Sequence, residues 1–156
     1  MSLSLLVFIG LNVLAASSGA LFRPGGWYRD LDKPAWRPPD WLFGPVWMVL
    51  YGMIAVSGWL VWQSAGWSGA PEAIAVYGVQ LVLNALWSAV FFGMRRPDLA
   101  LAEIVLLWLS IVATILLFQP FSQTAAWLLV PYLIWVSFAA VLNFSVYRRN
   151  RPFRMA

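Results

Sequence analysis

The sequence predicts an all-α membrane protein, a bundle of five transmembrane helices with a long structured loop between the first two. Of its 156 residues, 62% are hydrophobic and only 10% are charged, and the mean hydropathy is +0.77, far from an ordinary soluble domain. A membrane-spanning helix needs about 20 apolar residues. We find five such segments and expect them to form one domain over residues 1–156, with helices at about 3–22, 42–64, 71–93, 98–119 and 123–147.

The first segment, residues 3–22, is expected to remain in the protein as a helix. It has no basic leading region and no clear cleavage site, and four more apolar segments follow it, which argues against a signal peptide. Near its end, the string "LAASSGA" places Ala16 and Ala20 four residues apart. Small residues at this spacing let a neighbouring helix approach closely, so we expect this end to pack within the bundle.

The connection after the first segment contains the string "WYRDLDKPAWRPPDW" at residues 27–41. Its prolines fix the backbone and resist helix formation, while Trp36 and Trp41 supply apolar area with few rotatable bonds. This composition suits a folded cap rather than a flexible tether. The cap either seals the end of the bundle or acts as a lid over a pocket.

The second and third segments each carry aromatic or polar side chains on one face. Trp47 and Tyr51 lie about one turn apart in the second segment. In the third segment, four side chains fall within an arc of about 60° at 100° per residue. Polar side chains avoid lipid, so we expect this face to point into the bundle. The four residues are Gln80, Asn84, Trp87 and Phe91.

The opposite face of the third segment consists of small and smooth residues, Gly78, Val82, Ala85 and Ala89. Such a face suits plain lipid contact, and it also suits close pairing with a second copy in a homodimer. Both interpretations stay open at the level of the sequence.

The last two segments complete the inward pattern. Trp108 lies near the middle of the fourth segment, and one stripe of the fifth segment contains Trp135, Phe138, Ala139 and Leu142. Glu103 lies roughly 8 Å inside the basic end of the fourth segment. We expect Glu103 to snorkel to the interface or to pair with a loop cation, and a proton-coupling role is the alternative.

All ten Lys and Arg residues lie on one side of the five segments. By the positive-inside rule, the long loop and the C-terminus are cytoplasmic and the N-terminus faces the opposite compartment. The net charge of +4 then reflects topology and attraction to anionic lipid headgroups, and it gives no reason to expect nucleic acid as a partner. The ten residues are Arg23, Arg29, Lys33, Arg37, Arg95, Arg96, Arg148, Arg149, Arg151 and Arg154.

The chain contains no Cys and no His. This composition removes disulfides, thiolate nucleophiles, imidazole bases and the commonest ligands of zinc, copper and haem iron. We therefore expect no metal site, no required cofactor and no conventional catalytic constellation. Any activity must depend on shape, aromatic faces and amides.

The inward-facing side chains predict a pocket beneath the loop for a large, flat, apolar ligand. The tryptophans at positions 47, 87, 108 and 135 are too deep for an interfacial belt, so they are either core filler or pocket wall. A merely sealed bundle would not need amides and tryptophans converging beneath a folded cap. The candidate ligand-binding residues are Trp36, Trp47, Tyr51, Asn84, Trp87, Trp108, Trp135, Phe138, Ala139 and Leu142.

Three strings, "WYRDLDKPAWRPPDW", "LVLNALWSAVFFG" and "VPYLIWVSFAAVLNF", resemble the hallmark segments of the TspO/MBR family. This family contains tryptophan-rich sensory proteins and mitochondrial translocator proteins. The resemblance covers essentially the whole chain and implies five membrane helices and, commonly, a dimer. Carried over by motif, the pocket residues of the family fall on Trp36, Trp47, Asn84, Trp87, Trp135 and Ala139.

The same resemblance implies particular ligands, namely porphyrins such as protoporphyrin IX and, in many members, sterols and benzodiazepine-type drugs. This chain differs from the sterol motif of vertebrate members, because Phe144 in "VLNFSVYRR" stands where that motif has a tyrosine. We therefore discount sterol as the main ligand. Porphyrin propionates are expected at the loop side, near Lys33, Arg37 or Arg95.

Three functions follow from this resemblance. The first is a membrane receptor, sensor or carrier for tetrapyrroles, without axial capture of iron because no His or Cys is present. The second is a light-dependent porphyrin-degrading enzyme in which Trp47 and Trp135 are the catalytic candidates. The third is a structural protein that regulates partners, or a sterol or lipid transporter. The all-helical design and the charge asymmetry favour a bacterial inner membrane, although family members have also been assigned to outer membranes.

Overall fold

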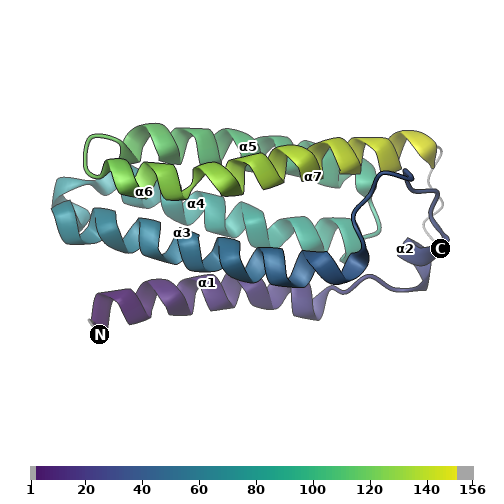
Figure 1. The fold of residues 1–156 in the computed structure, drawn as a ribbon, viewed down its shortest axis with the longest axis horizontal. Coiled ribbons are helices and arrows are strands. Elements are labelled where there is room, and N and C mark those ends of the chain that lie inside the picture. The colour runs from purple at the N-terminus through teal and green to yellow at the C-terminus, as the bar shows by residue number, and fades with distance from the viewer. Residues whose placement is uncertain (1–2, 151–156) are drawn as a thin grey trace.

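The computed structural model describes residues 3–150, which form long helices running side by side along one axis (Figure 1). Within residues 3–150, five helices are long and apolar enough to cross a membrane, which confirms the all-α, five-span prediction. The last span consists of two consecutive helices, α6 and α7. The elements are α1 (Leu3–Leu21), α2 (Gly26–Asp30), α3 (Asp40–Gly69), α4 (Pro71–Ser88), the π-helical segment η1 (Ala89–Gly93), α5 (Pro97–Phe118), α6 (Gln123–Leu128) and α7 (Val130–Arg149).

The helix boundaries follow from local sequence. Pro71 and Pro97 occupy the first positions of α4 and α5, where proline has no intrahelical N–H bond to lose. The hydroxyl of Ser122 caps α6 by accepting a hydrogen bond from the backbone N–H of Ala125 at 3.1 Å. The main departure from the predicted bounds is α3, which is longer at both ends than residues 42–64 and is kinked near its end, where Gly66 has a positive φ of 64° that glycine adopts readily.

Close packing of α4 explains much of the bundle. This helix packs mainly on α5 and α1, while α5 also packs on α7 and α3 packs on α1 and α6. Gly58 of α3 lies directly against the phenol ring of Tyr77, and a Cβ atom at this position would be only 2.6 Å from that ring. The Tyr77 hydroxyl donates to the carbonyl of Ile54 at 2.9 Å and accepts from the amide of Asn12 at 3.0 Å. Glycine is therefore required for the approach of α3 to α4.

At one end of the bundle, α7 projects beyond the first turn of α3 (Figure 1). The ring of Trp135 lies 5.5 Å from the ring of Phe43. Phe43 is only about 4.5 Å along the axis from the start of α3, whereas Trp135 is about 21 Å from the end of α7. The segment between α2 and α3 occupies the space left by this difference in length.

The described basic residues gather at this same end of the bundle. Arg23 follows α1, Arg29 lies in α2, Arg96 precedes α5 and Arg149 ends α7. Figure 1 shows these four places at one end, away from the N-terminus. Arg151 and Arg154 lie outside the described residues.

Candidate functional site

Five rings from the loop, α3 and α7 form one continuous group, which we call the loop-side aromatic cluster. Trp36 of the loop meets Phe138 edge-on with ring centroids 5.8 Å apart. Phe138 lies 5.7 Å from Trp135, which in turn contacts Phe43 at 5.5 Å and Trp47 at 6.5 Å. The structure thus brings together four of the predicted ligand residues and adds Phe43.

The rings of this cluster are only partly covered by protein. Trp36 is 50% exposed, and Trp47, Trp135 and Phe138 are all half-buried. The contacts are mostly edge-to-face, so aromatic faces are not all paired with one another. The cluster therefore presents uncovered aromatic surface beneath and beside the loop.

A chain of hydrogen bonds forms the polar floor of the cluster. The hydroxyl of Tyr51 donates to Asn84 Oδ1 at 2.6 Å, and Asn84 Nδ2 donates to the hydroxyl of Tyr132 at 2.8 Å. Tyr132 in turn donates to Gln80 Oε1 at 2.8 Å. Trp47 lies over this floor, with its ring 5.5 Å from Tyr51 and 6.3 Å from Tyr132. The network fixes Tyr51 and Asn84 and joins α3, α4 and α7.

Trp87 takes part in a second aromatic group beneath α2. Its ring stacks on Phe91 at 5.0 Å, and Trp27 and Tyr28 of the α2 region also contact Phe91. The Trp87 indole donates to Asn143 Oδ1 at 3.0 Å. Trp87 is inward-facing as predicted, but its ring contacts tie the loop end of α4 to α2 and not to the loop-side aromatic cluster.

Trp108 lies on a different side of α7 from the cluster. Its indole donates to the hydroxyl of Ser137 at 2.8 Å. Ser137 is two residues after Trp135, about 200° around the helix, so the structure does not bring Trp108 to Trp135. Ala139 and Leu142 continue the Trp135 side of α7 toward the basic end, with Ala139 half-buried and Leu142 buried.

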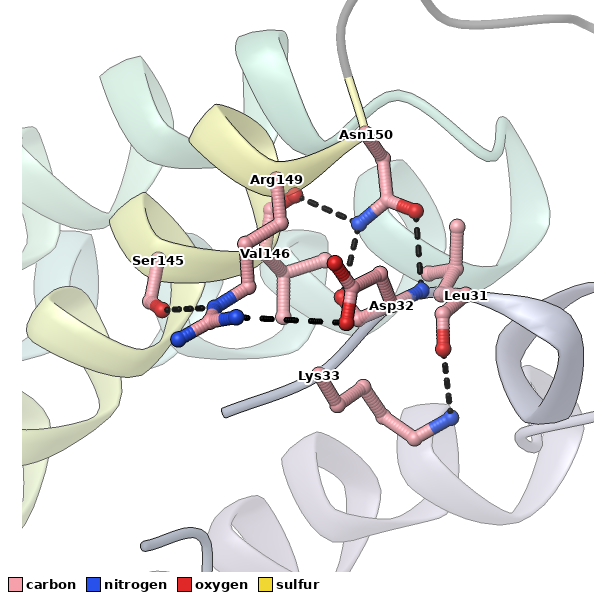
Figure 2. Close-up of polar contacts among 7 residues, drawn as sticks. All are labelled: Leu31, Asp32, Lys33, Ser145, Val146, Arg149 and Asn150. Carbon is pink, nitrogen blue, oxygen red and sulfur yellow. Dashed lines mark hydrogen bonds and ion pairs between the residues drawn. The ribbon is translucent and has the colours of Figure 1, made fainter. Parts of the chain in front are cut away.

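The first half of the loop is fixed to the end of α7 (Figure 2). The side-chain amide of Asn150 pairs with the backbone of Asp32 on both sides. It accepts from the Asp32 N–H at 2.9 Å and donates to the Asp32 carbonyl at 2.8 Å. Asn150 Nδ2 also donates to the carbonyl of Val146 at 2.8 Å. We call this arrangement the Asn150 clamp.

Lys33 stabilises the same half of the loop from within. Its ammonium donates to the carbonyls of Tyr28 at 2.7 Å, Arg29 at 3.0 Å and Leu31 at 3.2 Å. Desolvation lowers the pKa of Lys33, and the nearby Arg37 guanidinium lowers it further. The three donors of Lys33 are thus committed to the loop backbone, so Lys33 is not placed to bind a ligand carboxylate.

Glu103 behaves differently from the prediction. Both of its carboxyl oxygens are buried and have no hydrogen-bond partner among residues 3–150, and no ion pair joins it to a described loop cation. The expected snorkelling or pairing is therefore wrong. Glu103 shares the inward face of α5 with Ala100 and Leu107, which turns the side chain into the bundle.

A separate apolar groove of about 580 Å³ lies between α1 and α4, away from the loop-side aromatic cluster. Gly78, Val82 and Ala85 line its α4 side, so much of the small face of α4 borders this groove. The hydroxyl of Ser18 in α1 donates to the carbonyl of Ala85 and closes one part of that face.

Four contributors to this region were not predicted as site residues. Phe43 lies one turn before Trp47, and Tyr132 lies one turn before Trp135, so extension of each stripe by one turn would have found them. Asn143 and Asn150 gave no periodic signal, because their roles depend on partners in α4 and the loop.

Comparison with known proteins places these features in a family context. Residues 5–148 match the TspO/MBR family. The chain is 44% identical over 153 residues to the tryptophan-rich protein TspO of Chlorobaculum tepidum, covering 95% of this chain and 96% of that protein. It is 41% identical to the protein CrtK of Rhodobacter capsulatus, covering 96% and 95%. It is 39% identical to the human translocator protein, covering 82% and 77%.

Proposed function

Because this chain belongs to the TspO/MBR family of membrane proteins, we propose that it is a multi-pass membrane receptor, sensor or carrier for a tetrapyrrole. The ligand would bind at the loop-side aromatic cluster, with the loop as its cover. The names of the relatives support a sensory or translocator role in general terms. The identity of the ligand rests on the chemistry of the cluster and on the resemblance of the motifs.

The observation that carries this proposal is the uncovered aromatic surface of Trp36, Trp47 and Trp135. Porphyrins are large, flat and apolar, and aromatic faces stabilise them by stacking and by apolar burial. The side chains of Tyr51, Asn84 and Tyr132 in the polar floor are hydrogen-bonded to one another and to Gln80 Oε1, so these groups orient the aromatic wall, while Gln80 Nε2 is a buried donor without a partner among the described residues. Without His or Cys in the sequence, a metal-free porphyrin suits the site better than haem.

The second candidate function, light-dependent porphyrin breakdown, uses the same cluster. Its motivation is the contact between Trp47 and Trp135, whose ring centroids are 6.5 Å apart beside the expected ligand position. The sequence has no His and no Cys, and the described residues of the cluster are aromatic, so the photochemistry would belong to the ligand itself.

One experiment separates these functions. Protoporphyrin IX is added to the full chain in detergent, and the absorbance spectrum is recorded in the dark and after illumination. A stable spectral shift supports a receptor or carrier, whereas a shift that bleaches faster than free porphyrin under the same light supports the enzyme. The absence of any shift at micromolar protein would contradict both and leave a partner-regulating role.

We also propose that the basic end of the bundle faces the cytoplasm of a bacterial inner membrane. The gathering of the described basic residues at one end supports this orientation by the positive-inside rule. The chain has no native cysteine, so single cysteines at Asp30 and Ser68 report the two ends cleanly. An impermeant thiol reagent added to intact spheroplasts should label Ser68→Cys and not Asp30→Cys. The reverse pattern would invert the orientation.

We also propose that the protein forms a homodimer. Its support is the small face of α4, where the apolar groove beside Gly78 and Val82 leaves helix surface open to a neighbour. Light scattering that resolves the protein mass from the bound detergent tests this proposal. A purely monomeric mass in mild detergent and in nanodiscs would contradict it.

A further inference from the structure

The indole N–H of Trp135 is a buried donor with no hydrogen-bond partner among the described residues. This distinguishes it from the tryptophans nearby in the fold. Trp87 donates to Asn143 and Trp108 donates to Ser137, and each bond lies within a helix interface. Buried indole N–H groups usually find an acceptor, so the state of Trp135 calls for a physical reason.

The immediate surroundings of Trp135 offer rings in place of acceptors. Its ring contacts are Phe43, Trp47 and Phe138, all within the loop-side aromatic cluster. In the nearest polar network, Asn84 Oδ1 accepts from Tyr51 and Gln80 Oε1 accepts from Tyr132, and the group left unpaired there, Gln80 Nε2, is itself a donor. The unused donor is therefore inside the proposed ligand site and is not part of its supporting framework.

We propose that the Trp135 N–H selects ligands that carry an acceptor oxygen, a carboxylate or a carbonyl, on the edge that enters the cluster. This inference rests on the proposed function, since it assigns a specificity-determining residue to the same site. A ligand oxygen at this donor would form the bond that the protein leaves unmade. A hydrocarbon ligand of the same shape would leave the donor buried and unpaired, and discrimination of this kind is strong in apolar sites.

The position of Trp135 places the acceptor edge of the ligand on the loop side of the cluster. Because α7 projects past α3, the Trp135 ring lies beside Phe43 in the first turn of α3 and beside Phe138, which Trp36 of the loop contacts. A ligand oxygen at Trp135 would therefore be on the side of the cluster that faces the start of α3 and the loop. Lys33 does not take it, because the three donors of its ammonium are bonded to loop carbonyls.

The test compares two porphyrins, one with and one without carboxylates, and two proteins, one with and one without the indole N–H of Trp135. Mesoporphyrin IX and etioporphyrin are alkyl porphyrins of nearly equal size, and only the first carries carboxylates. The protein is compared with a full-length variant, Trp135→3-benzothienylalanine, which keeps the bicyclic ring and replaces N–H by sulfur. Affinities are measured by fluorescence quenching in the dark, in the same detergent.

The replacement is expected to weaken mesoporphyrin binding by about tenfold or more, as for a hydrogen bond to a charged acceptor, and to leave etioporphyrin binding within about twofold. The same replacement at Trp127, which is 68% exposed at the other end of the bundle, is the control and should change neither affinity.

Equal changes for both porphyrins, or no change for either, would overturn the inference. If neither affinity changes, the Trp135 N–H makes only a weak contact with a neighbouring ring. Failure of the unmodified protein to bind either porphyrin would instead contradict the proposed function.

Discussion

Removal of the Asn150 clamp is expected to loosen the first half of the loop without unfolding the bundle. In Asn150→Ala, the two hydrogen bonds to the Asp32 backbone and the bond to Val146 are lost. The two bonds to Asp32 are exposed to water, so each is expected to contribute about 0.5 kcal/mol, at the low end for hydrogen bonds in proteins. Their sum of about 1 kcal/mol corresponds to an increase of about fivefold in the population of the open loop.

Hydrogen–deuterium exchange measures this population directly. Peptides covering residues 27–33 should exchange about fivefold faster in Asn150→Ala, while peptides from α5 should be unchanged, because local opening exposes only the loop amides. The matched control is the neighbouring substitution Arg149→Ala. It removes an ion pair with Asp32 whose atoms are 3.9 Å apart and exposed, which is expected to change exchange by less than about twofold.

The reasoning is refuted if Asn150→Ala and Arg149→Ala give the same exchange in residues 27–33. That result would mean that packing of α2 against Phe91, and not the Asn150 clamp, holds this half of the loop. Faster exchange throughout α5 in Asn150→Ala would also contradict it, since the clamp would then contribute to the stability of the whole bundle.

Two further predictions follow from the packing and from the loop. Gly58→Ala should lower the free energy of unfolding by about 1–3 kcal/mol, because the new methyl group would meet the Tyr77 ring. The control is Gly52→Ala, which should not destabilise the protein because no described atom lies near its Cβ position. Thermal melts of both variants in the same detergent test this prediction. Replacing Pro38 and Pro39 together by glycine should accelerate porphyrin release and reduce the rise in melting temperature that the ligand causes, since closure then orders a more flexible segment. Stopped-flow displacement measures the release, and an unaltered off-rate with full stabilisation by the ligand would identify the loop as a passive seal.

The helices could be predicted from sequence because each has a strong local signal. Apolar length located the five spans. The inward faces of α3, α4 and α7 also followed from periodicity. Trp47 and Trp135 accordingly meet in the structure, 6.5 Å apart.

Periodicity could not say which neighbour an inward side chain meets. Trp87 points inward yet stacks on Phe91 beneath α2, and Trp108 points to Ser137 on the side of α7 away from Trp135. Both outcomes depend on the order and the axial offset of the helices. The Asn150 clamp has the same origin, since Asn150 reaches Asp32 only because α7 projects beyond the start of α3.

The most direct test of the account is a porphyrin titration of Trp47→Phe and Trp135→Phe in the dark, beside the unmodified chain. Each substitution removes part of a stacking surface worth about 0.5–1.5 kcal/mol, so each dissociation constant should rise by about two- to tenfold or more while the melting temperature without ligand changes little. Trp127→Phe, at the far end of the bundle, should bind as the unmodified chain does. Unchanged affinity in both cluster variants would contradict the central claim and assign these tryptophans to the protein core alone.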